Sequence, residues 1–335
     1  MTVHPFALLR RWPALLALAA LLATACGGNG DTAAPPDGTE PGPAVGGDLI
    51  ADNYDFADLE IRFGSKDFTE QLVLGQIARQ ALEAAGASVR LTENLPSPAG
   101  TRDALMAGQI DAAWEYTGTA WVNYLGHTEP IEDPMEQFEA VKREDLEKNG
   151  VFWAPPAPFN DTYGFAYREE AEDEFGVETI SDLKQFVQDN PDQATLCVDN
   201  NFASRDDGLP IVERVYDFTW PPDKLTVMDH AVLYPSADRG DPCNFTEVFT
   251  TDARIAALGL KVVEDDKEAF ISYLSSVMMM QEFADQHPEL ADLFEEIGQP
   301  ISEERMIELN TLVDVEGQFP EDAAAQYLRD EGFVQ

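Results

Sequence analysis

The clearest strand-to-helix pattern of the chain is Ile61-Arg62-Phe63-Gly64-Ser65-Lys66-Asp67-Phe68-Thr69-Glu70-Gln71-Leu72. Ile61 and Phe63 alternate with polar residues as in a strand, and the apolar residues that follow recur at helical spacing. Thr69 or Asp67 can cap this helix, whose free N–H groups and dipole favour an anion. Lys66 in the same loop therefore indicates a seat for a carboxylate or a phosphate. The alternative is an ordinary capped helix beside a solvated lysine.

The same order of strand, loop and helix recurs beyond this stretch. We expect strands at residues 60–63, 89–93 and 110–114 and helices at residues 70–85 and 101–107. This alternation predicts an α/β fold on a doubly wound, mainly parallel sheet. Ligands of such sheets lie at the carboxyl ends of the strands, where the loops of Lys66 and Tyr116 fall.

A Pro-rich segment at residues 154–159 interrupts the alternation and indicates a crossover to a second half of the chain. There we expect strands at residues 163–167, 195–198, 225–228, 248–250 and 258–263, and helices at residues 180–188 and 209–217. Residues 269–280 have the pattern of a helical region, which continues through residues 306–312 and 323–328.

The N-terminus has the pattern of an export signal. Arg10 and Arg11 precede a short apolar run that ends in Ala23-Thr24-Ala25-Cys26. These last residues are similar to a lipobox, so residues 1–26 are predicted to be a lipoprotein signal peptide with Cys26 as the lipidated residue. The alternative is an ordinary secreted protein that is cleaved nearby. Residues 27–57 are rich in Gly, Pro, Asp and Thr and are predicted to form a flexible tether.

Two further cysteines, Cys197 and Cys243, lie in a chain that is predicted to be exported, and thiols tend to oxidise outside the cytoplasm. A disulfide between them would contribute about 4 kcal/mol in the chain-entropy model. The alternative is a pair of buried free thiols.

The formal net charge of −42 makes nucleic acids and anionic lipid headgroups poor partners. Most acidic residues are expected to coat a solvated surface, which would suit a saline habitat. The acidic run Glu264-Asp265-Asp266 lacks the calcium-loop pattern, and the histidines lack metal-ligand spacing. Phosphate-cradle and nucleophile-elbow motifs are also missing from the sequence, so we predict no metal, no cofactor and no catalysis. An extracytoplasmic hydrolase is the alternative from another class.

Six segments occur in an order that resembles the glycine betaine/choline family of ABC-transporter substrate-binding proteins: 64–71 (GSKDFTEQ), 114–119 (WEYTGT), 159–163 (FNDTY), 204–208 (SRDDG), 250–252 (TTD) and 264–266 (EDD). The resemblance extends from about residue 59 to the end of the chain. It implies a type II periplasmic-binding-protein-like clamp with two lobes. Lobe I would comprise residues 58–157 and 275–335, and lobe II residues 158–274.

The resemblance also implies a binding site in which an aromatic cage surrounds a trimethylammonium group and two cationic side chains hold a carboxylate. Carried over by motif, the ligand-binding residues are Lys66, Tyr116, Thr119, Tyr163, Arg205, Phe249 and Tyr273. Phe249 stands where the family has a tyrosine, and Asp67 stands where asparagine is usual. The insertion at residues 235–242 and Cys243 also depart from the family pattern.

The implied function is capture of glycine betaine or a related quaternary ammonium osmolyte by an extracytoplasmic lipoprotein. Its partners would be permease and ATPase subunits on separate chains, and a lipid anchor would hold it on the outer face of the cytoplasmic membrane. The same clamp tuned to choline, carnitine or another amine is the nearest alternative. In the more conservative interpretation, Tyr163 and Tyr273 are packed core residues and Arg205 pairs with a neighbouring aspartate.

Overall fold

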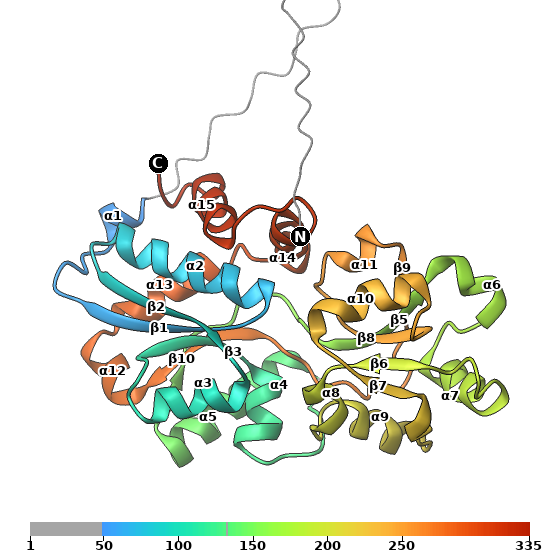
Figure 1. Cartoon of the computed structure of the whole chain (residues 1–335). Helices are drawn as coiled ribbons and strands as arrows, with labels where there is room; N and C mark the ends of the chain where they lie inside the picture. The colour runs from blue at the N-terminus through green and yellow to red at the C-terminus, as the bar shows by residue number, and fades with distance from the viewer. Residues whose placement is uncertain (1–48, 132) are drawn as a thin grey trace, which may run out of the picture. The chain divides into compact units, whose positions relative to one another are not determined.

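The computed structural model describes residues 49–131 and 133–335, which contain two five-stranded sheets (Figure 1). We call each sheet, with the helices packed on it, a lobe. The two-lobed α/β fold agrees with the prediction.

The first lobe combines the early part of the chain with one late strand. In sheet order its strands are β2 (Ser88–Leu95), β1 (Glu60–Lys66), β3 (Ala112–Tyr116), β10 (Ser275–Met280) and β4 (Val151–Trp153). The first three strands pair in parallel, whereas β10 runs antiparallel to both β3 and β4. The helices of this lobe are α1 (Ile50–Asn53), α2 (Thr69–Ala84), α3 (Pro98–Met106), α4 (Thr117–Thr119), a π-helical turn (Ala120–Tyr124), α5 (Pro134–Asn149), α12 (Gln281–Gln286), α13 (Glu289–Gly298), α14 (Glu303–Asp314) and α15 (Pro320–Asp330).

Helices cover both faces of the first sheet. The chain moves from β1 to β2 in one direction across the sheet and from β2 to β3 in the other, so right-handed crossovers place α2 and α3 on opposite faces (Figure 1). Both faces of the sheet are therefore covered, and β3 is buried along its whole length. Because β3 is packed on both faces, the position of its last residue, Tyr116, is well defined before the chain enters α4.

The second lobe lies between β4 and β10 in the sequence. In sheet order its strands are β7 (Leu225–Val227), β6 (Leu196–Val198), β8 (Phe245–Phe249), β5 (Tyr163–Arg168) and β9 (Leu260–Val263). β6 pairs in parallel with β7 and β8, and β5 pairs antiparallel with β8 and β9. The helices of this lobe are two 3₁₀ turns (Glu169–Ala171 and Pro222–Lys224), α6 (Glu172–Phe175), α7 (Ile180–Asp189), α8 (Asn200–Ser204), α9 (Leu209–Tyr216), α10 (His230–Arg239) and α11 (Arg254–Ala257).

The chain passes between the sheets twice, at residues 154–162 and 264–274, and these two segments pair with each other. Asn160 and Leu274 form an antiparallel bridge. The Tyr273 N–H donates to Asn160 Oδ1 at 2.6 Å, and the Asp161 N–H donates to the Tyr273 carbonyl at 3.3 Å. Asp161 and Tyr273 are therefore held on paired connecting segments.

Two details of the predicted fold are wrong. Each sheet is mixed, with two parallel and two antiparallel pairings, rather than mainly parallel. The second error is the helix expected at residues 269–280, because residues 275–280 form β10. This strand lies between β3 and β4 and buries both of its faces. Its run of methionines therefore lacks the alternation that marks a half-exposed strand.

The predicted tether is also too long. The Ile50 and Phe56 side chains are buried in the hydrophobic core, and their N–H groups donate to the carbonyls of Phe333 and Ala85. Residues 49–57 therefore belong to the folded part of the chain. The predicted signal, Cys26 and residues 27–48 of the tether lie outside the described residues.

A disulfide joins Cys197 of β6 to Cys243, which lies just before β8. Both cysteines are fully buried in a small cluster beneath α10. This helix contains part of the insertion at residues 235–242. The disulfide attaches the end of the insertion to the second sheet, because Cys243 directly follows it.

Within residues 49–131 and 133–335, none of the helices is long and apolar enough to span a bilayer.

The start of α7 gives a prediction about stability. Thr179 accepts from the Asp182 N–H at 3.1 Å, and Asp182 accepts in return from the Thr179 N–H at 2.9 Å, which forms a capping box. Replacing Thr179 with alanine is expected to lower the free energy of unfolding by about 1 kcal/mol, because one helix N–H loses its partner. Urea denaturation measures this loss. Thr179→Ser should retain the stability of the original protein, and an unchanged midpoint for Thr179→Ala would contradict the assignment.

Candidate functional site

A cavity of about 470 Å³ is lined by residues of both lobes. All seven side chains that the sequence predicted to bind the ligand line it: Lys66, Tyr116, Thr119, Tyr163, Arg205, Phe249 and Tyr273. The predicted site residues are therefore brought together. Their roles in binding stay a prediction.

The sheets explain this convergence. Lys66 ends β1 and Tyr116 ends β3, so both lie at the carboxyl ends of neighbouring parallel strands. Tyr163 begins β5 and Phe249 ends β8, and antiparallel register places them opposite each other. Tyr273 comes from the segment that leads into β10, where Ser275 pairs with Tyr116.

Five aromatic rings form a continuous chain along the cavity. In order they are Tyr116, Phe68, Phe249, Tyr163 and Tyr273, and neighbouring ring centroids lie 6.3, 5.6, 5.4 and 5.5 Å apart. Aromatic rings present a negative face to a cation. The cavity is therefore suited to an organic cation.

Gly118 allows Tyr273 to reach this chain of rings. A Cβ atom at position 118 would lie 2.7 Å from both the Ser272 carbonyl oxygen and the Tyr273 ring. A side chain there would push Tyr273 away from the cavity, which explains a glycine within the Trp114–Thr119 segment.

Lys66 is buried, so the alternative of a solvated lysine is wrong. Its ammonium group pairs with the buried carboxylate of Glu115 and lies 4.5 Å from the centroid of the Tyr116 ring. Glu115 also accepts from Tyr124 Oη at 2.7 Å. Burial lowers the pKa of Lys66, and the charge of Glu115 opposes this shift.

The predicted cap of α2 is wrong. Phe68 occupies the N-cap position, and no side chain there accepts a hydrogen bond from the helix. Thr69 instead donates to Asp314 Oδ1 at 2.6 Å. The Phe68 ring lines the cavity, which the sequence did not predict.

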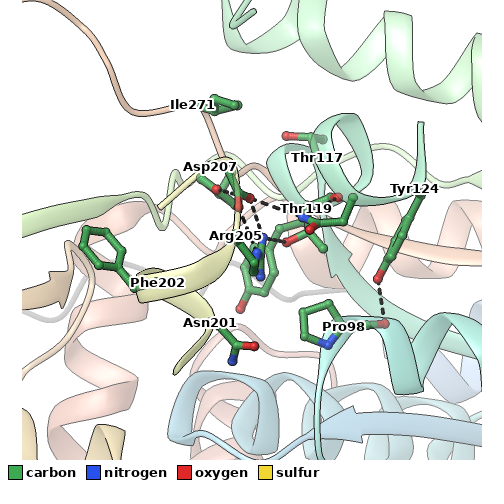
Figure 2. Close-up of polar contacts among 12 residues, drawn as sticks. Pro98, Thr117, Thr119, Tyr124, Asn201, Phe202, Arg205, Asp207 and Ile271 are labelled. Carbon is green, nitrogen blue, oxygen red and sulfur yellow. Dashed lines mark hydrogen bonds and ion pairs between the residues drawn. The ribbon is translucent and has the colours of Figure 1, made fainter. Parts of the chain in front are cut away.

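Arg205 lies at the end of α8 and pairs with Asp207, as the conservative interpretation allowed (Figure 2). Its Nε donates to Asp207 Oδ1 at 2.8 Å, and its Nη2 lies 3.5 Å from Thr119 Oγ1. Tyr273 Oη donates to the same aspartate at 2.7 Å. Asp207 thus holds a cationic side chain and an aromatic wall of the cavity in place, and Arg205 links this group to Thr119.

Sequence reasoning missed several other residues of the cavity wall, among them Phe68, Asp161 and His230. The His230 ring stacks on Phe249 at 4.6 Å, and among the described residues its buried Nε2 has no partner. Burial and the neighbouring charge of Arg254 lower the pKa of His230. Phe68 and Asp161 lie within the segments 64–71 and 159–163, but the sequence does not mark them as cavity residues. Spacing gave no signal for His230, which reaches the cavity through its contact with Phe249.

The acidic run at residues 264–266 has a structural role. Asp265 and Asp266 accept hydrogen bonds from Tyr216 and Ser181. Within residues 49–131 and 133–335, no group of three or more His, Cys, Asp or Glu side chains could hold a metal ion.

Two α/β lobes with paired connecting segments, and a ring-lined cavity built from both, define a two-lobed solute-binding protein. The chain belongs to the OpuAC family, described as the substrate-binding domain of the ABC-type glycine betaine transport system, whose model matches residues 60–330. The family resemblance is confirmed.

Similar proteins support this assignment. A glycine-betaine-binding protein of Pseudomonas aeruginosa is 33% identical over 275 residues, which cover 81% of this chain and 87% of that protein. An ergothioneine transport permease/ergothioneine binding protein of Helicobacter pylori is 31% identical over 79% of this chain but only 46% of its own length. A crystal structure of a glycine betaine/carnitine/choline ABC transporter superposes with a TM-score of 0.67 at 26% identity, covering 82% of this chain and 99% of that one.

Proposed function

We propose that this protein captures a small quaternary ammonium zwitterion, with glycine betaine as the first candidate, and delivers it to an ABC permease. The observation that carries the proposal is the chain of five rings beside two cationic side chains. The protein would bind its ligand and release it without chemical change.

The ring-lined cavity supports binding of the trimethylammonium group. A cation gains roughly 0.5 to 2 kcal/mol at an aromatic face, and more where water is excluded. Several rings, with charge-assisted hydrogen bonds of about 1.5 to 3 kcal/mol each, offset the cost of ordering the ligand. The sum is compatible with a micromolar ligand, which needs about −8 kcal/mol.

Unused donors of Lys66 and Arg205 support binding of the ligand carboxylate. The ammonium group of Lys66 has three N–H donors, and its pairing with Glu115 uses one of them. Arg205 bonds through Nε and Nη2, and no described residue accepts from its Nη1. Both side chains can therefore keep their present partners and still donate to a carboxylate in the cavity.

We further propose that the lobes, at residues 58–157 with 275–335 and at residues 158–274, close on the ligand. The segments that would bend are the paired residues 154–162 and 264–274. Rings and cationic groups come from both sides, so a ligand makes its full set of contacts in the shut form alone.

The N-terminal sequence supports a location outside the cytoplasm. A charged start, an apolar run and Ala23-Thr24-Ala25-Cys26 favour export and attachment of lipid to Cys26. The protein would then work on the outer face of the cytoplasmic membrane, with permease and ATPase subunits as separate chains.

Choline is the second candidate, and one observation favours it. Lys66 and Arg205 each face a buried carboxylate, Glu115 and Asp207, which weakens their attraction for a ligand carboxylate. A ligand without a carboxylate would not compete with Glu115 and Asp207 for these two cationic side chains.

Titration calorimetry with glycine betaine, carnitine, ergothioneine and choline tests the proposed function. We expect at least one of the three zwitterions to bind in the micromolar range and to bind more tightly than choline. A preference for choline would assign the site to cations. Absence of binding by all four compounds would refute the proposed function.

A further inference from the structure

The hydroxyl group of Thr251 lies between two buried carboxyl groups beside the cavity. Thr251 Oγ1 is 2.6 Å from Glu70 Oε2 and 2.7 Å from Asp161 Oδ1. Glu70 belongs to α2 of the first lobe, Thr251 follows β8 of the second, and Asp161 lies on a connecting segment. All three side chains are at most 5% exposed. One contact therefore joins both lobes and the segment between them.

This contact needs one more hydrogen than the Thr251 hydroxyl group can supply, because two carboxyl groups lie within hydrogen-bond distance of it. A threonine hydroxyl has a single hydrogen, so it can donate to one of the two carboxyl groups. If both were ionised, the other carboxylate would face a hydroxyl lone pair inside a buried site, at a large cost in free energy. One carboxyl group is therefore protonated and donates to Thr251 Oγ1.

The other contacts place this proton on Asp161. Glu70 accepts from Tyr116 Oη at 2.7 Å and lies 3.4 Å from Asn310 Nδ2, and both donors favour its ionised form. Among the described residues, the Asp161 carboxyl group has Thr251 as its one hydrogen-bond partner, through the hydroxyl group and the backbone N–H. Burial raises the pKa of both carboxyl groups, but the hydrogen bonds to Glu70 oppose its shift, whereas burial and the charge of Glu70 raise the pKa of Asp161 well above its ordinary value.

Other charged and titratable groups surround Asp161, and they come from both lobes: Lys66, Tyr116, His230, Asp252, Arg254 and Asp314. The positive charges of Lys66 and Arg254 favour an ionised Asp161, but each is already paired with another carboxylate. The acidic members of the set oppose ionisation. A proton on Asp161 is therefore the favoured state of the cavity without a ligand.

We propose that Asp161 is a specificity-determining residue that exchanges its proton for the positive charge of the ligand. In the empty cavity its carboxyl group is protonated. When a quaternary ammonium group enters, the Asp161 O–H bond breaks and the proton passes to solvent. The carboxylate that remains faces the bound cation, whose attraction offsets the cost of ionising both carboxyl groups of this contact. This exchange rests on the proposed function and favours ligands with a permanent positive charge over neutral molecules of the same shape.

Calorimetric titration with glycine betaine, in buffers of different ionisation enthalpy at one pH, counts the released protons. Repeated from about pH 5 to about pH 9, it should find a range in which about one proton leaves per betaine bound, with affinity rising about tenfold per pH unit. The sign follows from the cation, which lowers the pKa of Asp161, so that binding strengthens as pH rises.

Two variants locate the proton. Asp161→Asn can still donate to Thr251, and it should release no proton and show a flat affinity over the same range. Glu247→Gln is the matched control, because Glu247 of β8 is a buried carboxyl group with a pKa raised by burial and lies outside the cavity wall. It should release protons as the original protein does.

The outcomes separate this inference from the proposed function. Betaine binding without proton release at any pH would overturn the inference and leave the proposed function intact. Proton release that persists in Asp161→Asn would also overturn it. Failure of glycine betaine to bind at all would overturn the inference, and the four-compound titration would then decide the proposed function.

Discussion

Replacing Lys66 with alanine is expected to lower the free energy of unfolding by about 3 kcal/mol and to weaken glycine betaine binding far more than choline binding. The first effect arises because Glu115, which is fully buried, loses the cation it is paired with. Tyr124 Oη and the Tyr116 N–H still donate to it, so the variant should fold. Urea denaturation measures the stability.

The effect on binding is measured in a variant that also lacks the buried negative charge of Glu115. The double variant Lys66→Met, Glu115→Gln replaces the ion pair with neutral groups of similar size, and such replacements are often close to neutral in stability. It should recover most of the lost stability. Betaine should bind it more weakly than it binds the original protein, while choline, which lacks a carboxylate, should be little affected. Equal losses for both ligands would reject the carboxylate role of Lys66.

Replacing Tyr116 with alanine is expected to weaken glycine betaine binding by at least tenfold, or about 1.4 kcal/mol. The Tyr116 ring ends the chain of rings, next to Phe68, and loss of one aromatic face removes roughly 0.5 to 2 kcal/mol of attraction for a cation. The substitution also removes the hydrogen bond from Tyr116 Oη to Glu70. Titration calorimetry measures the affinity.

Tyr116→Phe is the matched control, because it keeps the ring and loses the hydroxyl group alone. It should retain most of the affinity. If Tyr116→Phe were as damaging as Tyr116→Ala, the hydroxyl group rather than the ring would be the binding element. An unchanged affinity in Tyr116→Ala would remove Tyr116 from the cage.

Seven of the cavity residues could be predicted from the sequence because most of them begin or end strands or lie in short motifs. Lys66 and Tyr116 follow from the rule that ligands sit at the carboxyl ends of parallel strands. β10 could not be predicted in the same way, since a strand buried on both faces and rich in methionine has no two-residue periodicity.

Sequence patterns could not predict which residues form hydrogen bonds or packing contacts with the site residues. Glu70 and Thr251 are 181 positions apart, and in so acidic a chain a buried carboxyl group such as Asp161 cannot be told from a solvated one. Phe68 reads as an ordinary apolar residue before a helix, and its place in the cavity wall follows from its ring contacts with Tyr116 and Phe249. These features depend on tertiary contacts.

Calorimetric titration of the purified protein with glycine betaine and with glycine is the most direct test of the aromatic cage. Both ligands carry a carboxylate and a positive charge, but glycine lacks the three methyl groups, each worth about 0.8 kcal/mol on burial. We predict micromolar binding of glycine betaine and binding of glycine weaker by about a hundredfold. Equal affinity for the two ligands, or no binding of glycine betaine, would contradict the account.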